Sequence, residues 1–156
     1  MAVAAVGALA LAACSSTRVS GPTEIGDGIA QPVAPLRHEV IQVAASQVGI
    51  PYRYGGNSRR GFDCSGLVQY AHRQAGIEIP RTTESQWASA RTPDRRQLLP
   101  GDLLFFDVDD KKSRHVAIYE GDGLFIHAPS SGKRVSRASL DNPYWQSRLI
   151  GTKTFL

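Results

Sequence analysis

Cys64, His115 and His127 are the side chains in this sequence that together could carry out covalent catalysis. A thiolate is a nucleophile, an imidazole can take up and return its proton, and a third polar group can hold that imidazole in place. The same side chains are zinc ligands by type. However, one distant cysteine and two histidines with eleven residues between them give no compact ligand spacing. We therefore expect nucleophilic catalysis without a metal or another cofactor.

The residues around Cys64 place it in the first turn of a predicted helix. Asp63 has the side chain preferred at a helix N-cap, and Leu67, Val68 and Ala71 follow at helical spacing. The unpaired N–H groups and the helix dipole at such an end favour an anion, so we expect the thiol pKa to be lowered there. An isolated cysteine is more often a small buried apolar residue. Its combination with the two histidines favours the catalytic interpretation.

The relative position of the two histidines depends on the turn between their strands. If residues 121–123 form a three-residue loop, Ala117 lies opposite His127, and His115 points to the same face as His127. A two-residue turn would place the two imidazoles on opposite faces of the sheet. The prediction that the imidazoles touch rests on the longer loop.

The apolar periodicity changes from helical to strand-like along the chain, which predicts an α+β fold with helices packed on a mostly antiparallel central sheet. The helices are expected at Leu36–Val48, at Cys64 to about Gly76, and from a cap at Thr82 or Thr83 to about Ala90. The strands are expected at 102–106, 115–119, 124–127, 134–136 and 149–155. We also expect Trp87 and Trp145 in the core, and His38 and His72 in solvent.

The N-terminal residues have the composition of an export signal. Residues 1–13 are predominantly apolar and too few to span a bilayer, and Leu11-Ala12-Ala13-Cys14 resembles the lipobox of bacterial lipoproteins. We expect a signal peptide at 1–13, lipid on Cys14, a flexible tether at 14–37 and one domain at 38–156. Ser15 after the lipidated cysteine is typical of lipoproteins of the outer membrane, facing the periplasm.

Lipidation of Cys14 would leave Cys64 without a disulfide partner in an oxidising compartment, which calls for a chemical reason to retain it. The net charge of +4 is mild and spread along the chain. That distribution predicts no nucleic-acid partner and tolerance of an anionic wall or membrane surface.

From about residue 38 to residue 155 the chain resembles the NlpC-type cysteine peptidases of bacterial cell walls, which have a papain-like fold. The motifs are Pro51-Tyr52-Arg53-Tyr54-Gly55-Gly56, Asp63-Cys64-Ser65-Gly66, Pro80-Arg81-Thr82-Thr83, Pro100-Gly101-Asp102-Leu103, His115-Val116-Ala117-Ile118-Tyr119 and Phe125-Ile126-His127-Ala128. The resemblance implies that Cys64 is the nucleophile, His115 the general base and His127 the orienting third residue. It also implies that Tyr52, Asp63 and Ser65 face the substrate.

Other roles stay open for the residues around this triad. Asp63 can simply cap the helix, Tyr52 can be a packing aromatic, and Arg81 can bind a substrate carboxylate or lie on the surface.

We therefore expect a monomeric cysteine endopeptidase that hydrolyses peptidoglycan stem peptides and is held at a lipid bilayer. The sequence leaves two candidates for the bond that is cut: the cross-link from D-alanine to diaminopimelate and the stem bond from γ-D-glutamate to diaminopimelate. The short, single-domain form is most similar to the cross-link cutters. Two other functions also remain open: a non-catalytic wall-binding lipoprotein, and an acyltransferase on the same fold.

Overall fold

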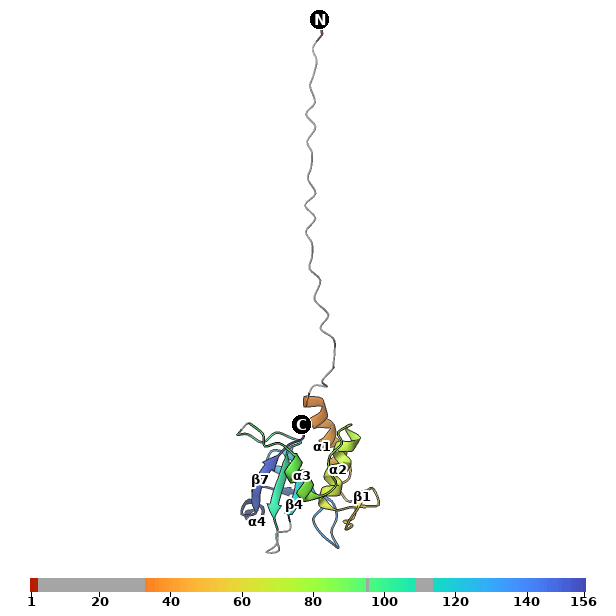
Figure 1. The fold of residues 1–156 in the computed structure, drawn as a ribbon, viewed down its shortest axis with the longest axis vertical. Helices are drawn as coiled ribbons and strands as arrows, with labels where there is room; N and C mark the ends of the chain where they lie inside the picture. The colour runs from red at the N-terminus through yellow and green to blue at the C-terminus, as the bar shows by residue number, and fades with distance from the viewer. Residues whose placement is uncertain (3–32, 95, 109–113) are drawn as a thin grey trace. The chain divides into compact units, whose positions relative to one another are not determined.

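The structure is a computed structural model that describes residues 1–2, 33–94, 96–108 and 114–156. The predicted signal peptide after its first two residues, Cys14 and most of the predicted tether lie outside these residues. Within the described residues, no helix is both long enough and apolar enough to cross a bilayer. Residues 31–156 form one unit (Figure 1).

A five-stranded antiparallel sheet is the centre of this unit, with the strand order β6-β5-β4-β3-β7. Short strands β1 (Asn57–Ser58) and β2 (Gly61–Phe62) form a separate pair before the second helix. The five strands of the main sheet are β3 (Leu103–Asp107), β4 (Arg114–Gly121), β5 (Leu124–His127), β6 (Ser136–Ser139) and β7 (Leu149–Lys153). The predicted α+β class with an antiparallel sheet is therefore confirmed.

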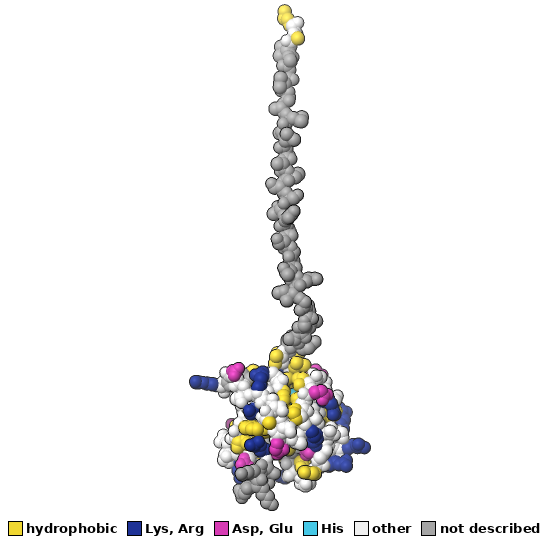
Figure 2. Space-filling model, viewed as in Figure 1, with side chains coloured by type: hydrophobic (Ala, Val, Ile, Leu, Met, Phe, Trp, Pro, Cys, Tyr) yellow, Lys and Arg dark blue, Asp and Glu magenta, His cyan; other side chains and the backbone are white. Residues whose placement is uncertain are grey.

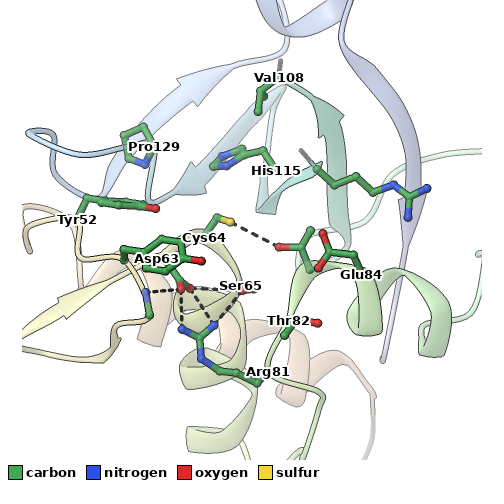
Figure 3. A pocket seen from close by; sticks show the side chains of 14 residues that line it. Tyr52, Asp63, Cys64, Ser65, Arg81, Thr82, Glu84, Val108, His115 and Pro129 are labelled. Atoms are coloured by element: carbon green, nitrogen blue, oxygen red, sulfur yellow. Dashed lines mark hydrogen bonds and ion pairs between the residues drawn. The ribbon is translucent and has the colours of Figure 1, made fainter. Parts of the chain in front are cut away.

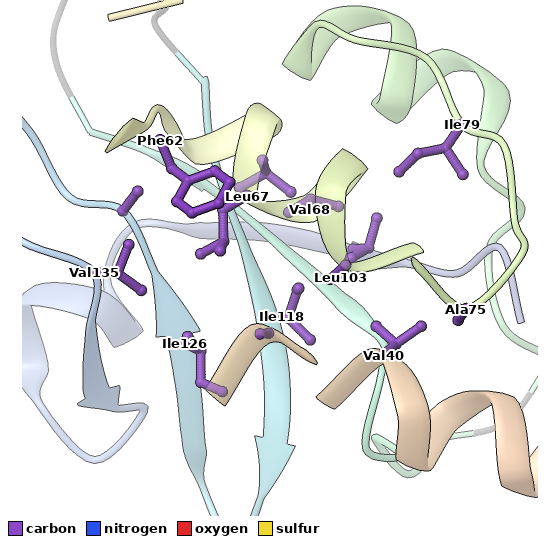
Figure 4. Packing of buried hydrophobic residues seen from close by; sticks show 14 of the residues in the cluster. Val40, Phe62, Leu67, Val68, Ala75, Ile79, Leu103, Ile118, Ile126 and Val135 are labelled. Carbon is purple, nitrogen blue, oxygen red and sulfur yellow. The ribbon is translucent and has the colours of Figure 1, made fainter. Parts of the chain in front are cut away.

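Two helices, α1 (Val33–Ala45) and α2 (Cys64–Gln74), pack against each other and against β4. Figure 4 shows the core between them and the sheet, with Leu67 and Val68 of α2 over Leu103 and Ile118. All four of these side chains are fully buried. The helices α3 (Thr83–Ser89) and α4 (Pro143–Gln146) are shorter. This packing fixes the start of α2 over one end of β4.

The other face of the sheet has a smaller core. Alternation along the strands directs Leu104, Phe106, Ala117 and Phe125 to this face, where all four are fully buried. Trp145, from α4, packs against this cluster, at 4.9 Å between its ring centroid and that of Phe106.

The first helix begins at Val33, three residues before the expected start at Leu36, and it ends at Ala45 instead of Val48. Pro35 is tolerated because the N–H that it lacks belongs to the first turn. Val48, expected on the buried stripe, is exposed, since the helix has already given way to a turn.

Arg37 is part of the domain, although it was expected in the tether. Its guanidinium donates to Asp102 Oδ1 at 2.9 Å, to the Pro100 carbonyl at 2.8 Å and to the Leu156 carbonyl at 3.2 Å. It thereby joins α1 to the start of β3 and to the C-terminus.

The β4–β5 hairpin differs from the expected three-residue loop. Asp122 and Gly123 form a two-residue turn with φ values of 50° and 76°, as a type I′ turn requires. Such a turn alone would place His115 and His127 on opposite faces of the sheet. However, the register shifts between Tyr119 and Gly121, which leaves Glu120 as an extra, bulged residue. The pairing of Ile118 with Ile126 is the register that the longer loop would have given.

The remaining differences concern short elements. The strand expected at 134–136 begins only at Ser136, because Arg134 instead forms an isolated bridge with Pro51. Helix α4 was not predicted, and the β1–β2 pair lies at and just after the end of the segment expected to be a loop, 51–57. Figure 2 shows basic and acidic side chains interspersed on the face that it displays.

His72 is buried, so the expectation that it is solvated was wrong, whereas His38 is exposed as expected. His72 lies on α2 four residues after Val68, on the stripe that faces the core. Its Nδ1 hydrogen bonds the Val68 carbonyl at 2.9 Å, while its Nε2 is buried without a partner among the described residues. Burial lowers its pKa to about 4, partly offset by that hydrogen bond.

We predict that His72 makes the domain sensitive to acid. The unfolded chain binds a proton at this side chain near its ordinary pKa of 6.5, whereas the folded chain does so only near 4. The free energy of unfolding is therefore not reduced by His72 above pH 6.5, and it decreases as the pH falls toward 4 because the unfolded chain binds the proton more strongly. At pH 5 the loss amounts to about 2 kcal/mol.

Urea unfolding of the parent and of His72→Leu at pH 7.5 and pH 5 measures this difference. The leucine variant should lose less free energy of unfolding between the two pH values. His38→Leu is the matched control and should follow the parent. The same pH dependence in all three proteins would contradict the prediction.

Candidate active site

A cavity of about 580 Å³ contains nearly all of the side chains singled out by the sequence. Figure 3 shows Cys64 at its centre, with His115 across from the sulfur and Arg81 below it. Residues from the loop before β1, from α2, from the start of α3 and from β4 line the cavity. The expected substrate contacts among them are Tyr52, Asp63, Ser65 and Arg81.

Cys64 is the first residue of α2, as expected from its N-cap. Asp63 Oδ1 accepts the Gly66 N–H at 2.7 Å, whereas the Cys64 N–H is among the first-turn donors that have no partner within the helix. Gly66 has no Cβ because the Gly56 carbonyl occupies the space that a Cβ would need. The first turn of α2 is thereby held tightly against the glycine pair of the preceding loop.

Burial raises the pKa of the Cys64 thiol, contrary to the expectation that the helix start lowers it. Hydrogen bonds from Thr83 and from the backbone at Val116 and Ser65 oppose this effect, and the charge of Asp63 adds to it. Desolvation of an anion outweighs the helix-end contribution, which falls off within a turn. The resting thiol is protonated, so a base must take its proton.

Thr83 is a contact that the sequence did not indicate. Its hydroxyl lies 3.6 Å from the Cys64 sulfur, and the residue is only 6% exposed. In the described part of the chain, this sulfur is the only hydrogen-bond partner of the hydroxyl. Buried hydroxyl groups form hydrogen bonds. When this hydroxyl donates to the sulfur, the hydrogen bond stabilises a thiolate.

His115 and His127 form a buried pair. His115 Nε2 lies 2.9 Å from His127 Nδ1, so the prediction that the imidazoles touch is confirmed. Burial lowers the pKa of His115 to about 3 and that of His127 to about 4. Both rings are neutral at pH 7. When the proton of His115 is on Nε2, its Nδ1 is a free base.

Trp145 covers the histidine pair on the side away from the main core. Its ring stacks on His115 with 5.8 Å between the centroids and 30° between the planes, and it meets His127 edge-on at 5.0 Å. Trp145 is half-buried and packs on the smaller core, as expected, but it also lines a second cavity. Trp87 packs edge-on against Phe105 and remains half-buried.

Arg81 is bound to its own chain. Its guanidinium donates to both oxygens of Asp63, at 2.9 and 2.6 Å, to Ser65 Oγ at 2.9 Å and to the Gly56 carbonyl at 3.3 Å. Asp63 also accepts the Gly55 N–H at 2.9 Å. The carboxylate of Asp63 is therefore neutralised inside the protein, and Arg81 is a positioning group in this state.

Tyr52 lies at the edge of the cavity before α2. Figure 3 shows its ring to the left of Cys64, with the hydroxyl directed toward the space in front of the sulfur. The residue is half-buried, and burial, followed by the charges of Cys64 and Asp63, raises its pKa. It is therefore a neutral hydrogen-bond donor near the sulfur.

The described residues do not meet the requirements of a metal site. Within residues 33–94, 96–108 and 114–156, no group of three His, Cys, Asp or Glu side chains converges as a metal site would require. The arrangement instead supplies a thiol, a neutral imidazole base and a second imidazole behind it.

A protein-family model described as the NlpC/P60 family matches residues 49–154. The chain belongs to the NlpC/P60 family. It is 42% identical over 142 residues to the probable endopeptidase NlpC of Escherichia coli, and the match covers 89% of this chain and 88% of that one. It is 42% identical over 112 residues to the murein DD-endopeptidase MepH of Escherichia coli, covering 69% of this chain and 41% of that one.

A crystal structure of an NlpC/P60 family protein from Bacillus cereus superimposes with a TM-score of 0.70 at 34% identity, over 77% of this chain and 40% of that one. NlpC/P60 domains have the papain-like fold, so that expectation is confirmed. The chain spans between 29% and 60% of the length of further curated relatives.

We predict that Thr83→Val shifts the reactivity of Cys64 to higher pH, because the thiolate loses a hydrogen-bond donor. The rate of Cys64 alkylation by iodoacetamide, measured from pH 5 to 10, reports the thiolate directly. At pH 7 the rate should fall about tenfold, the effect of one hydrogen bond to a charged group. Thr83→Ser retains the hydroxyl and should behave as the parent. Equal profiles for the valine and serine variants would refute the role.

Proposed function

We propose that this protein is a cysteine endopeptidase that cuts the D-alanyl-diaminopimelate cross-link of peptidoglycan, and that Cys64, His115 and His127 are its catalytic triad. The observation that carries the proposal is that Cys64 and His115 line one cavity while His127 bonds the far side of the His115 ring at 2.9 Å. The similarity to a probable endopeptidase and to a murein DD-endopeptidase supports the reaction class.

In the proposed reaction, His115 takes the Cys64 proton and the sulfur attacks the carbonyl carbon. The Cys64 N–H and the Tyr52 hydroxyl are the donors best placed for the oxyanion. His115 then gives the proton to the departing amine, which leaves a thioester. Water activated by His115 hydrolyses this thioester and restores the thiol. His127 holds the base and shares the charge of the imidazolium.

The state of Asp63 favours the cross-link over the stem bond. Cutting a stem near a free amine on L-alanine calls for an unpaired carboxylate to bind that amine. Here both oxygens of Asp63 are engaged by Arg81 and by backbone N–H groups. An amine would have to displace a guanidinium, so a substrate without this charge fits the cavity better.

Purified cross-linked muropeptide dimers test the reaction. The parent should convert them to monomers, identified by mass, and Cys64→Ser should lower turnover by at least about a thousandfold while leaving the unfolding midpoint unchanged. Free stem peptides serve as the second substrate. Dimers left intact while γ-D-glutamyl-diaminopimelate bonds are cut would assign the other bond.

Two further functions give different results in the same assay. A non-catalytic wall-binding module would bind peptidoglycan and release nothing. An acyltransferase would cleave only when an amine or alcohol acceptor is added, and its product would carry that acceptor in place of water.

We further propose that Cys14 carries lipid and anchors the protein in the outer membrane, facing the periplasm. The support is the Leu11-Ala12-Ala13-Cys14 sequence, followed by Ser15. A monomer held by a tether could reach the wall from this surface. Peptidoglycan and the bilayer are the partners of this proposal.

We predict that the mature N-terminus is a lipidated Cys14. Mass measurement of the protein purified from membranes decides this, because acylation adds the mass of its fatty chains to the cysteine. Cys14→Ala should move the protein to the soluble fraction or leave the precursor unprocessed. A membrane-bound protein with an unmodified Cys14 would contradict the prediction.

A further inference from the structure

A second cavity, of about 540 Å³, lies next to the first. Val108, His115 and Pro129 line both cavities, so the two meet at the imidazole. Figure 3 shows these three side chains on the opposite side of Cys64 from Arg81. The rest of the second cavity is formed by Ser130, Lys133, Tyr144 and Trp145.

The proposed reaction divides its substrate between the two cavities. The acyl half stays bound to the Cys64 sulfur, which lies in the first cavity. The amine half receives its proton from His115 and must therefore lie against that ring. Beyond His115 the surface continues into the second cavity.

Lys133 gives the second cavity a positive charge. It is the only ionised side chain among the described residues that line the cavity, since His115 is neutral. Within the described residues its ammonium group has neither an ion pair nor a side-chain hydrogen bond, and the residue is exposed. Its charge reaches the histidine pair, because it adds to burial in lowering the pKa of His127.

We propose that the second cavity binds the leaving half of the cross-link, and that Lys133 pairs with the carboxylate on the carbon atom that bears the departing amine. This inference rests on the proposed function. In a D-alanyl-diaminopimelate cross-link that carboxylate is free. In the stem bond the corresponding carboxyl group is used in the next peptide bond of a tetrapeptide stem.

The walls of the cavity suit the remainder of the diamino acid. The Trp145 ring stacks on His115, and the Tyr144 ring meets Trp145 edge-on at 5.0 Å between the two ring centroids. Both rings present apolar surface for an aliphatic chain. A cation beside an apolar wall matches a ligand with a carboxylate on a methylene chain. Lys133 is thus a specificity determinant that selects the cross-link on its amine side.

Two purified dimers test the proposal, one with this carboxylate free and one with it amidated, using the full chain. Lys133→Met should lower kcat/KM for the free-acid dimer about tenfold, the effect of losing one charge-assisted bond. It should leave kcat/KM for the amidated dimer unchanged. Lys133→Arg keeps the charge and should retain most of the preference.

Two controls separate this role from damage to the fold. Lys153→Met removes a lysine that lines neither cavity and should leave both kcat/KM values unchanged. The rate of Cys64 alkylation should be equal in the parent and in Lys133→Met.

The outcomes distinguish the inference from the proposed function. If the parent cleaves neither dimer, the proposed function itself is overturned. If the parent cleaves both dimers and Lys133→Met changes the two kcat/KM values by the same factor, or changes neither value, the proposed function stands and the subsite is overturned. A loss confined to the free-acid dimer supports both.

Discussion

The packing of the first turns of α2 against β4 is the constraint on which the site depends. Leu67, Val68 and Ala71 are fully buried and hold the helix on the sheet. Gly66 allows the helix to touch the loop before it, because a Cβ would meet the Gly56 carbonyl. The sulfur, at the N-terminus of the helix, and the imidazole, near the start of the strand, are therefore placed relative to each other by apolar packing. The polar groups of the site need only adjust the chemistry.

That chemistry is set by burial more than by formal charge. Desolvation keeps Cys64 protonated and His115 and His127 neutral, so these three side chains carry no charge in the resting site. In the proposed reaction, charge appears on them only when the proton moves from the sulfur to the imidazole, and Thr83 and His127 each contact one end of the new pair. Below them, Arg81 pairs with Asp63 at 2.6 Å, although the charge of Asp63 still contributes to raising the pKa of Cys64.

The sequence allowed the class of fold, the helix start at Cys64 and the histidine contact to be predicted, because each follows from periodicity or from local capping chemistry. Thr83, Trp145 and Lys133 could not be found in this way. Their roles come from the approach of α3, α4 and the loop after β5 to the site, which no local pattern encodes. His72 was misassigned because a polar residue type was weighed above its position on the buried stripe. Arg81 was expected to be available to substrate, and only the tertiary structure pairs it with Asp63.

The bulge at Glu120 places a restriction on the length of the hairpin between the two histidines. Side chains alternate along a strand, so removing this one residue, or adding one beside it, would turn every later side chain of β5 to the other face. His127 would then point toward α1 and α2, and His115 would lose its partner while the sheet kept its hydrogen bonds. Insertions and deletions in this hairpin can therefore be accepted only in pairs. A gap of one residue here, in an alignment of related sequences, would mark a protein that keeps the fold but has lost the histidine pair.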